Sequence, residues 1–173
     1  MTAVPEPHEV LNALSSGDAA AALVRCCGSS RWVESMLARR PFASTETLLW
    51  AADEVWFGLH KADYLEAFSH HPQIGADLAK LRQKFANTAG WSGQEQASVH
   101  AASEATLVAL RDGNVLYLAR YGFIFIVCAA GKSADEMLSL LRARLDHSVE
   151  DELAIAAREH AKIARLRLEK LTP

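Results

Sequence analysis

Short groups of turn-forming residues divide the chain into segments of helical length, and no other feature restricts its fold as strongly. Gly17-Asp18 precedes AAAALVRCC, residues 28–30 (GSS) precede RWVESMLARR, and residues 41–44 (PFAS) precede TETLLWAADEVWFGL. Turn residues at such intervals typically separate helices. The chain has 173 residues and no linker-like tract or internal repeat, so it is long enough to bury one continuous core. We therefore predict an all-α, single compact domain over residues 1–173, with about eight helices.

The segment 115–131, VLYLARYGFIFIVCAAG, differs from the rest because it is rich in β-branched and aromatic residues. Such a run is typical of a buried strand. No other segment alternates between apolar and polar residues as a strand does, and a single strand has no partner with which to form a sheet. We expect a buried helix or a partly extended segment inside the all-α domain.

Charge and hydropathy exclude several classes of function. A formal charge of −3 provides no basic surface for nucleic acid, and ARLRLEK at 164–170 is a poor basic recognition helix in so acidic a chain. The N-terminus lacks the charged and apolar regions of a signal peptide, and no run reaches the roughly 18 apolar residues of a membrane span. We expect a soluble, cytoplasmic protein whose partner is a small molecule or another protein, with neither nucleic acid nor membrane as a partner.

The residues that most often bind metals or act as nucleophiles carry no recognisable motif. The seven histidines and three cysteines lack the spacing of a metal site. Adjacent Cys26 and Cys27 and the isolated Cys128 are expected to be buried free thiols rather than a disulfide framework. The chain has no GxSxG, no P-loop and no GxGxxG after a strand, so acyl transfer and nucleotide binding have no signature. We expect no metal.

Helix starts and one core position can be predicted from local patterns. Ser44 is an expected N-cap, Ser133 stands in capping-box spacing with Glu136, and Ser148 precedes an acidic first turn. In the segment that follows Ser44, apolar residues recur at steps of three and four. Trp56 lies on that apolar face and is expected in the core.

The stretch EAFSHHPQIG, residues 66–75, presents His71 immediately before Pro72 at the end of a helical segment. A proline disfavours helical geometry in the residue before it, so we predict that the helix ends near His70. Imidazole titrates near neutral pH, which suits a proton donor or acceptor. His71 is therefore a candidate catalytic group. The alternative is that its side chain caps the last carbonyls of the helix.

A second candidate lies in GWSGQEQASVHAA, where Ser92 and Glu95 have S-x-x-E spacing before a long helical segment. The default role of Glu95 is a capping box with Ser92. A helix N-terminus also attracts anions, so a carboxylate substrate can dock there while Glu95 accepts hydrogen bonds from it. Both roles remain open, because the two oxygens of one carboxylate can divide them.

The last helical segment contributes an arginine. At about 100° per residue, one stripe contains Val149, Leu153, Ala156, His160, Ile163, Arg167 and Leu171. Arg158 and Arg165 point nearly opposite, so we predict that Arg167 points inward and meets a carboxylate of the protein or of a ligand. The alternative is that it snorkels to solvent at the end of a terminal helix.

Taken together, several blocks resemble one family. They are RCCGSSRWVESMLARRPF (25–42), ADEVW (52–56), EAFSHHPQIG (66–75), EQA (95–97), YGFIFIVCAAGKSADEML (121–138) and KIARLRLEKL (162–171). In this order and at these separations the chain resembles the 2-oxo-4-hydroxy-4-carboxy-5-ureidoimidazoline (OHCU) decarboxylases, which complete the conversion of urate to allantoin. The resemblance implies an all-α fold, no cofactor and no metal, and a homodimer.

The resemblance also implies a set of site residues. His71 would act in proton transfer with Pro72 beside it, and Arg167 matches the arginine of the C-terminal R-L motif. Substrate contacts would come from Ser92, Glu95 and Gln96, and backbone groups from Phe123, Ile124, Phe125, Ile126 and Val127. Many members carry Arg where this chain has Gln73 and Asp where it has Ala76, so a charge pair near the corner is missing.

The implied reaction needs no external electron sink. Loss of CO₂ leaves carbanion character that an adjacent carbonyl can accept as an enolate-like intermediate, and the protein must then deliver one proton to one face to give (S)-allantoin. We expect His71 to supply or relay that proton, Glu95 to anchor the ureido or hydroxyl group, and Arg167 to bind a carboxylate or the developing oxyanion. An alternative is a helical relative of the family that binds a ureide without catalysis.

Overall fold

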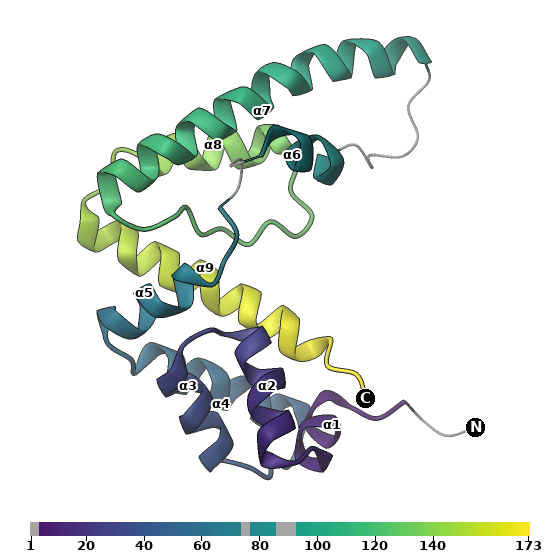
Figure 1. Ribbon diagram of the computed structural model, residues 1–173, viewed down its shortest axis with the longest axis vertical. Helices are drawn as coiled ribbons and strands as arrows, with labels where there is room; N and C mark the ends of the chain where they lie inside the picture. Colours follow the sequence, from purple (N-terminus) through teal and green to yellow (C-terminus); the bar gives the residue numbers. More distant parts are fainter. Residues whose placement is uncertain (1–3, 74–76, 86–92) are drawn as a thin grey trace. The chain divides into compact units, whose positions relative to one another are not determined.

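The protein is built from helices, as the sequence predicts. The computed structural model describes the backbone of residues 4–73, 77–85 and 93–173, and the side chains of these residues apart from 84–103. Within these ranges every regular element is a helix (Figure 1). The nine helices described are α1 (Pro7–Ala13), α2 (Ser16–Cys26), α3 (Ser30–Ala38), α4 (Thr45–Phe57), α5 (Lys61–Ser69), α6 (Leu78–Phe85), α7 (Gly93–Tyr121), α8 (Ala134–Arg144) and α9 (Val149–Glu169).

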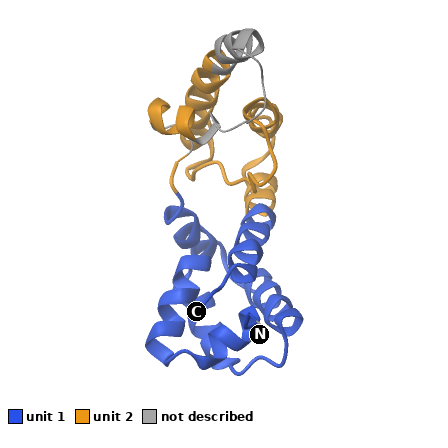
Figure 2. Cartoon of the chain, turned by 90° about the vertical axis from the view of Figure 1, so that its right-hand side faces the viewer, with its two compact units in different colours: residues 1–71, 157–173 blue, residues 72–156 orange. Residues whose placement is uncertain are grey.

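The helices form two compact units, coloured separately in Figure 2. Unit 1 comprises Met1–His71 with Ala157–Pro173, and unit 2 comprises Pro72–Ala156. The boundary therefore falls inside α9, whose N-terminal part belongs to unit 2 and whose C-terminal part belongs to unit 1. That the whole chain acts as one domain stays a prediction. Within the described residues, no helix has both the length and the apolar character of a membrane span.

Side-chain caps start the helices where the sequence predicts them. The backbone N–H of Thr47 donates to Ser44 Oγ over 3.0 Å, and Ser133 forms a complete capping box with Glu136. The N–H of Asp151 donates to Ser148 Oγ over 3.1 Å. Each bond satisfies an N–H group that the first helical turn leaves without a partner.

Two buried tryptophans fix the helices of unit 1 to one another. Trp32 of α3 donates its indole N–H to the Ala52 carbonyl of α4 over 3.0 Å. Trp56 of α4 donates in the same way to the Ala157 carbonyl of α9 over 2.9 Å. Trp56 is 2% exposed, which confirms its predicted place in the core. The C-terminal part of α9 is therefore tied to α4 by a hydrogen bond as well as by packing.

The apolar segment 115–131 is part helix and part extended, as predicted. Helix α7 continues to Tyr121 and ends at Gly122, whose φ of 76° lies in the left-handed region. Glycine adopts this conformation without the steric cost of a Cβ atom. The N–H of Gly122 donates to the Leu118 carbonyl over 2.9 Å, which satisfies one of the last carbonyls of the helix. The chain then continues without regular structure and buries the side chains of Phe123, Phe125, Ile126, Val127 and Cys128.

A buried ion pair anchors this extended segment within unit 2. Arg144 of α8 and Glu152 of α9 are 5% and 0% exposed, and Arg144 Nε donates to the Glu152 carboxylate. Arg144 Nη1 donates to the Ile126 carbonyl over 2.6 Å, and the Tyr117 hydroxyl donates to Glu152 over 2.5 Å. The guanidinium also lies 4.6 Å from the ring centroid of Phe125. Arg144 therefore links two helices to the backbone of the extended segment.

Replacing Glu152 with Gln is expected to destabilise unit 2. The substitution keeps the shape but leaves the buried Arg144 guanidinium without its counter-charge, which costs roughly 3 kcal/mol or more. Urea unfolding followed by far-ultraviolet circular dichroism measures the loss. The control is Glu150→Gln, an exposed carboxylate of the same helix, for which about 0.5 kcal/mol or less is expected. Equal stability of the two variants would contradict the structural role of the pair.

Candidate active site

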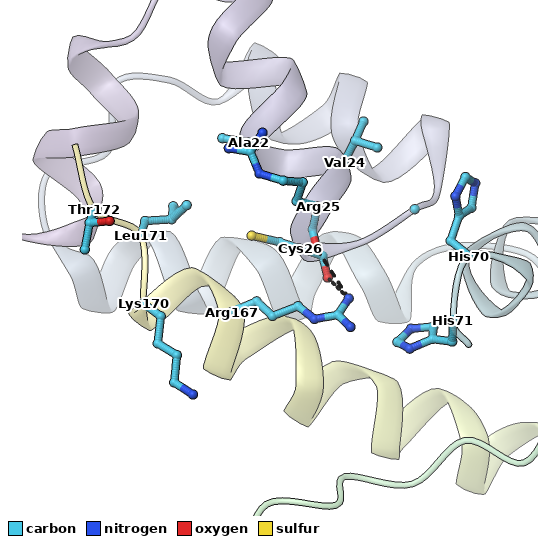
Figure 3. A pocket seen from close by; sticks show the side chains of 11 residues that line it. Ala22, Val24, Arg25, Cys26, His70, His71, Arg167, Lys170, Leu171 and Thr172 are labelled. Carbon is cyan, nitrogen blue, oxygen red and sulfur yellow. Dashed lines mark hydrogen bonds between the residues drawn. The ribbon is translucent and has the colours of Figure 1, made fainter. Parts of the chain in front are cut away.

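A pocket of about 690 Å³ lies within unit 1, where the C-terminal ends of α2, α5 and α9 meet (Figure 3). His70 and His71 come to this pocket from the end of α5, Arg25 from α2 and Arg167 from α9. Its full lining is Ala22, Val24, Arg25, Cys26, Gly28, His70, His71, Arg167, Lys170, Leu171 and Thr172. The structure therefore brings together two of the three residues that the sequence predicts as catalytic, His71 and Arg167.

The corner that carries His71 is formed as the sequence predicts. Helix α5 ends at Ser69, and the N–H groups of His70 and His71 donate to the Ala67 and Phe68 carbonyls over 3.2 and 3.1 Å. Backbone groups thus cap these carbonyls, which leaves the His71 side chain available to the pocket, where Figure 3 places it.

Gly28 sets the position of the same corner from the other side. A Cβ atom at residue 28 would lie 2.5 Å from Cδ2 and 2.8 Å from Cβ of His70. Real Cβ atoms do not approach other heavy atoms so closely, and the Cβ of His70 cannot rotate away. The link between α2 and α3 can therefore lie directly against the corner only because residue 28 is glycine.

The imidazole of His71 is neutral at neutral pH. Burial lowers the pKa of His71, and the positive charge of Arg167 and the neighbouring His70 lower it further, to about 4. Desolvation disfavours the charged form of an imidazole, and a nearby cation acts in the same direction. His71 is therefore set to accept a proton at neutral pH.

The buried face of α9 differs from the predicted stripe. Arg167 is exposed, and the prediction that it points inward is wrong for the residue as a whole. The buried stripe is turned by about one residue from the predicted one: Val149 is exposed and Leu153 is partly exposed, whereas Ala157, Ala161 and Ala164 are buried. The residues buried along α9 are Glu152, Ala156, Ala157, His160, Ala161, Ala164 and Leu168.

At the edge of that face, the Arg167 guanidinium turns toward the end of α2. Its Nη1 atom donates to the carbonyls of Arg25 and Cys26 over 3.3 and 3.4 Å (Figure 3). These are the last carbonyls of a helix, where the dipole is negative and favours a cation. Within the protein, Arg167 therefore pairs with backbone carbonyls where a carboxylate was predicted. These carbonyls hold the side chain at the pocket.

His160 has a place in the site that the sequence did not indicate. It is 0% exposed, its ring stacks on Trp56 with centroids 4.3 Å apart, and the ring of His71 lies 4.9 Å away and nearly perpendicular. Neither of its ring nitrogens has a hydrogen-bond partner in the described part of the chain. Burial, followed by His71 and Arg167, lowers the pKa of His160 to about 3. The only signal in the sequence was its spacing from Arg167 along the helix.

The cysteines near the pocket are free and buried, as predicted. Burial raises the pKa of Cys26 to about 11 and that of Cys27 to about 12. Because the thiolate is the reactive form, neither thiol is a nucleophile at neutral pH. Among the residues described, no group of three or more His, Cys, Asp or Glu side chains could hold a metal ion.

The remaining predicted site residues lie elsewhere. Ser92 is outside the described residues, and so are the side chains of Glu95 and Gln96, although both are within α7. Pro72 begins unit 2 and is exposed. The segment 123–127 also belongs to unit 2: Ile124 is partly exposed, while Phe123, Phe125, Ile126 and Val127 are buried. The Ile126 carbonyl already accepts a hydrogen bond from Arg144.

Comparison with known proteins identifies the family. The family model described as OHCU decarboxylase matches residues 12–169. The chain belongs to the OHCU decarboxylase family. It is 42% identical over 149 residues to the uric acid degradation bifunctional protein TTL of Arabidopsis thaliana, covering 84% of this chain but only 45% of that protein. It is 26% identical over 140 residues to the 2-oxo-4-hydroxy-4-carboxy-5-ureidoimidazoline decarboxylase of Haloferax volcanii, covering 80% of each.

Solved structures agree with this assignment. An OHCU decarboxylase crystallised in the presence of (S)-allantoin matches with a TM-score of 0.68 and 36% identity, covering 85% of this chain and 94% of that one. An (S)-allantoin synthase matches with a TM-score of 0.66 at 20% identity, covering 95% of this chain and 53% of that one, which supports the fold alone. The all-α prediction is thus confirmed by structures of the family as well as by the helices described.

Gly28→Ala is expected to displace the corner of this OHCU decarboxylase family member. The added methyl group must push His70 away, so we expect a loss of about 1–3 kcal/mol in the free energy of unfolding. Urea unfolding followed by tryptophan fluorescence measures it. Gly17→Ala is the matched control, because a Cβ atom there would meet only the Ser15 hydroxyl oxygen at 4.0 Å. If Gly28→Ala were as stable as this control, Gly28 would not determine the position of the corner.

Proposed function

We propose that this protein catalyses the cofactor-free decarboxylation of OHCU to (S)-allantoin. The single observation that carries the proposal is the shared pocket of His71 and Arg167 in unit 1 of a chain that matches the family over residues 12–169. One side chain can accept a proton at neutral pH, and the other is a permanent cation. The proposed decarboxylation uses both properties, a cation to bind the anionic substrate and a base to accept its hydroxyl proton.

The substrate's systematic name defines the electron flow. Carbon 4 of the ring carries the hydroxyl and the carboxylate, and carbon 5 carries the ureido group and a double bond to ring nitrogen. When the bond to CO₂ breaks, its electron pair forms a double bond between carbons 4 and 5, and the displaced pair goes to the nitrogen. Protonation of that nitrogen, loss of the hydroxyl proton and protonation of carbon 5 then give allantoin, with one proton taken up overall. The acceptor is thus a C=N group rather than a carbonyl.

The two pocket residues divide this chemistry. Neutral His71 accepts the hydroxyl proton and returns a proton to one face of carbon 5, which makes the product chiral. Arg167 binds the substrate carboxylate first and then stabilises the oxyanion that develops on carbon 4. The stabilisation contributes to the rate only as far as it is stronger for the oxyanion than for the carboxylate.

Other predicted residues complete the proposed site. Glu95, Ser92 and Gln96 are proposed to bind the ureido or hydroxyl group, with Pro72 next to His71. Backbone groups of residues 123–127 are proposed to contact the ring, and the Ile126 carbonyl among them also accepts a hydrogen bond from Arg144. We further propose that the protein is a cytoplasmic homodimer. Free Cys26 and Cys27 fit a reducing compartment, and light scattering after size-exclusion chromatography tests the dimer.

The chirality of the product tests the function. Urate is converted with urate oxidase and hydroxyisourate hydrolase, and circular dichroism follows allantoin in the presence and absence of the protein. Spontaneous decay of OHCU gives racemic allantoin, so we expect a dichroic signal of the S enantiomer only when the protein is present. Racemic product at the uncatalysed rate would overturn the proposed activity and favour a non-catalytic ureide-binding protein.

His71→Asn is expected to lower kcat by roughly 10²- to 10⁴-fold while the fold is retained. His70→Asn is the control, because it removes the adjacent imidazole, keeps the Cβ and Cγ atoms that contact Gly28, and should change kcat little.

In the wild type, kcat/KM should stay constant from pH 7 to pH 5 and fall only as the pH drops through about 4, where His71 becomes protonated. Near-normal turnover of a folded His71→Asn variant would remove His71 from the mechanism.

A further inference from the structure

His160 is buried in a way that packing alone does not explain. It is 0% exposed and both ring nitrogens lack a hydrogen-bond partner among the described residues. Buried polar atoms are nearly always hydrogen-bonded, and an exception usually has a role in binding or catalysis. An apolar side chain of the same size would fill the position without this cost. The nitrogen atoms are therefore the feature to be explained.

The contacts of His160 place its ring against His71, which lines the pocket. One face of the ring is covered by Trp56, at a centroid distance of 4.3 Å and an interplanar angle of 20°. Phe68 lies 5.9 Å away, tilted by 46°. A polar side chain, His71, also lies close, with its ring 4.9 Å away at 82°. At this separation, and with one ring edge directed at the other, the two imidazoles are in contact.

We propose that His160 is a positioning residue for His71, which holds the His71 ring toward the pocket and accepts a hydrogen bond from it when it becomes protonated during turnover. The inference rests on the proposed function. The indole of Trp56 fixes His160 from behind through stacking, and its N–H bond to Ala157 fixes the backbone of α9 nearby. His160 itself stays neutral, because it is the more deeply buried imidazole and its pKa is lowered to about 3. It therefore keeps a lone pair that can receive the proton of His71.

Among the described residues, the other polar groups named beside His71 do not fill this role. Arg167 of α9 and Arg25 of α2 are cations that only donate hydrogen bonds, and Cys26 is a neutral thiol, a weak acceptor. His70 precedes His71 and is exposed, and its Cβ, Cγ and Cδ2 atoms lie against Gly28. All four groups remain when His160 is replaced, so a change in the titration of His71 can be assigned to His160.

His160→Phe tests the proposal by keeping a ring but removing both nitrogens. We expect the variant to fold, to lose roughly 10-fold in kcat and to change KM by less than about 2-fold, since the lost contact acts on protonated His71. The acid limb of kcat/KM should move to lower pH, because protonated His71 loses an acceptor and its pKa falls. His160→Gln and His160→Asn place an amide near Nε2 and Nδ1 respectively, and one of them should recover part of the loss. A folded His160→Phe variant with wild-type kcat and pH profile would overturn the proposal.

A measurement independent of activity separates this inference from the proposed function. Nitrogen-15 NMR of the full chain follows the titration of His71, which is assigned by its loss in His71→Asn. We expect His160→Phe to lower the midpoint of the His71 titration, whether or not the wild type is a decarboxylase. An unchanged midpoint would mean that the two imidazoles are not coupled, even in an active enzyme. A lowered midpoint in a wild type that forms only racemic allantoin would reject the activity and leave the coupling in place.

If His160→Phe does not fold, the reciprocal variant His71→Phe tests whether the two imidazoles are coupled. Coupling between two sites is symmetric, so His71→Phe should change the ring nitrogen shifts of His160 when wild type and variant are compared at low pH. His8→Phe, a substitution of a histidine that bonds Thr45 in another part of unit 1, serves as the control and should leave them unchanged. Identical His160 spectra in wild type and His71→Phe would reject the proposal.

Discussion

The contact between Trp56 and α9 is the interaction on which the candidate site depends. The indole N–H donates to the Ala157 carbonyl over 2.9 Å, and the same ring stacks on His160. A carbonyl has two lone pairs, so this bond adds to the helical one instead of replacing it. Because α9 also carries Arg167, one buried side chain of α4 fixes the helix that supplies both a cation to the pocket and an imidazole behind it. The position of the site is thus set by the core of unit 1.

In unit 2 a charged residue has the corresponding structural role. Arg144 would be costly to bury alone, but Glu152 balances its charge, and the Tyr117 hydroxyl and the Ile126 carbonyl complete its hydrogen bonds. The extended segment after Gly122 has no regular secondary structure to satisfy its backbone. An arginine with a fixed, planar set of donors can satisfy a carbonyl there while it pairs with a carboxylate. This explains how an apolar stretch with strand-like composition remains extended in an all-helical protein.

The sequence predicts what depends on local chemistry and fails where tertiary packing decides. Ser44 and the Ser133–Glu136 pair start helices because a cap acts within one turn, and Pro72 ends α5 near His70 for a similarly local reason. The buried face of α9 follows instead from neighbours distant in sequence, so the predicted stripe was turned and Arg167 proved to be exposed. The role of His160 was not predicted for the same reason. Spacing places it on the inner face of α9, but its unpartnered ring nitrogens and its contact with His71 depend on how the helices of unit 1 pack.

The way Arg167 is held bears directly on its use. A carboxylate of the protein, which the charge alone suggests, would hold the guanidinium but also neutralise it. The terminal carbonyls of α2 hold it through bonds of 3.3 and 3.4 Å to Arg25 and Cys26. These carbonyls place only the partial negative charge of a helix end, about half an elementary charge, beside the full positive charge of Arg167. Most of the positive charge therefore remains available to an anion in the pocket, and it acts next to an imidazole that the same charge helps to keep neutral. A cation and a proton acceptor can in this way occupy one pocket without cancelling each other.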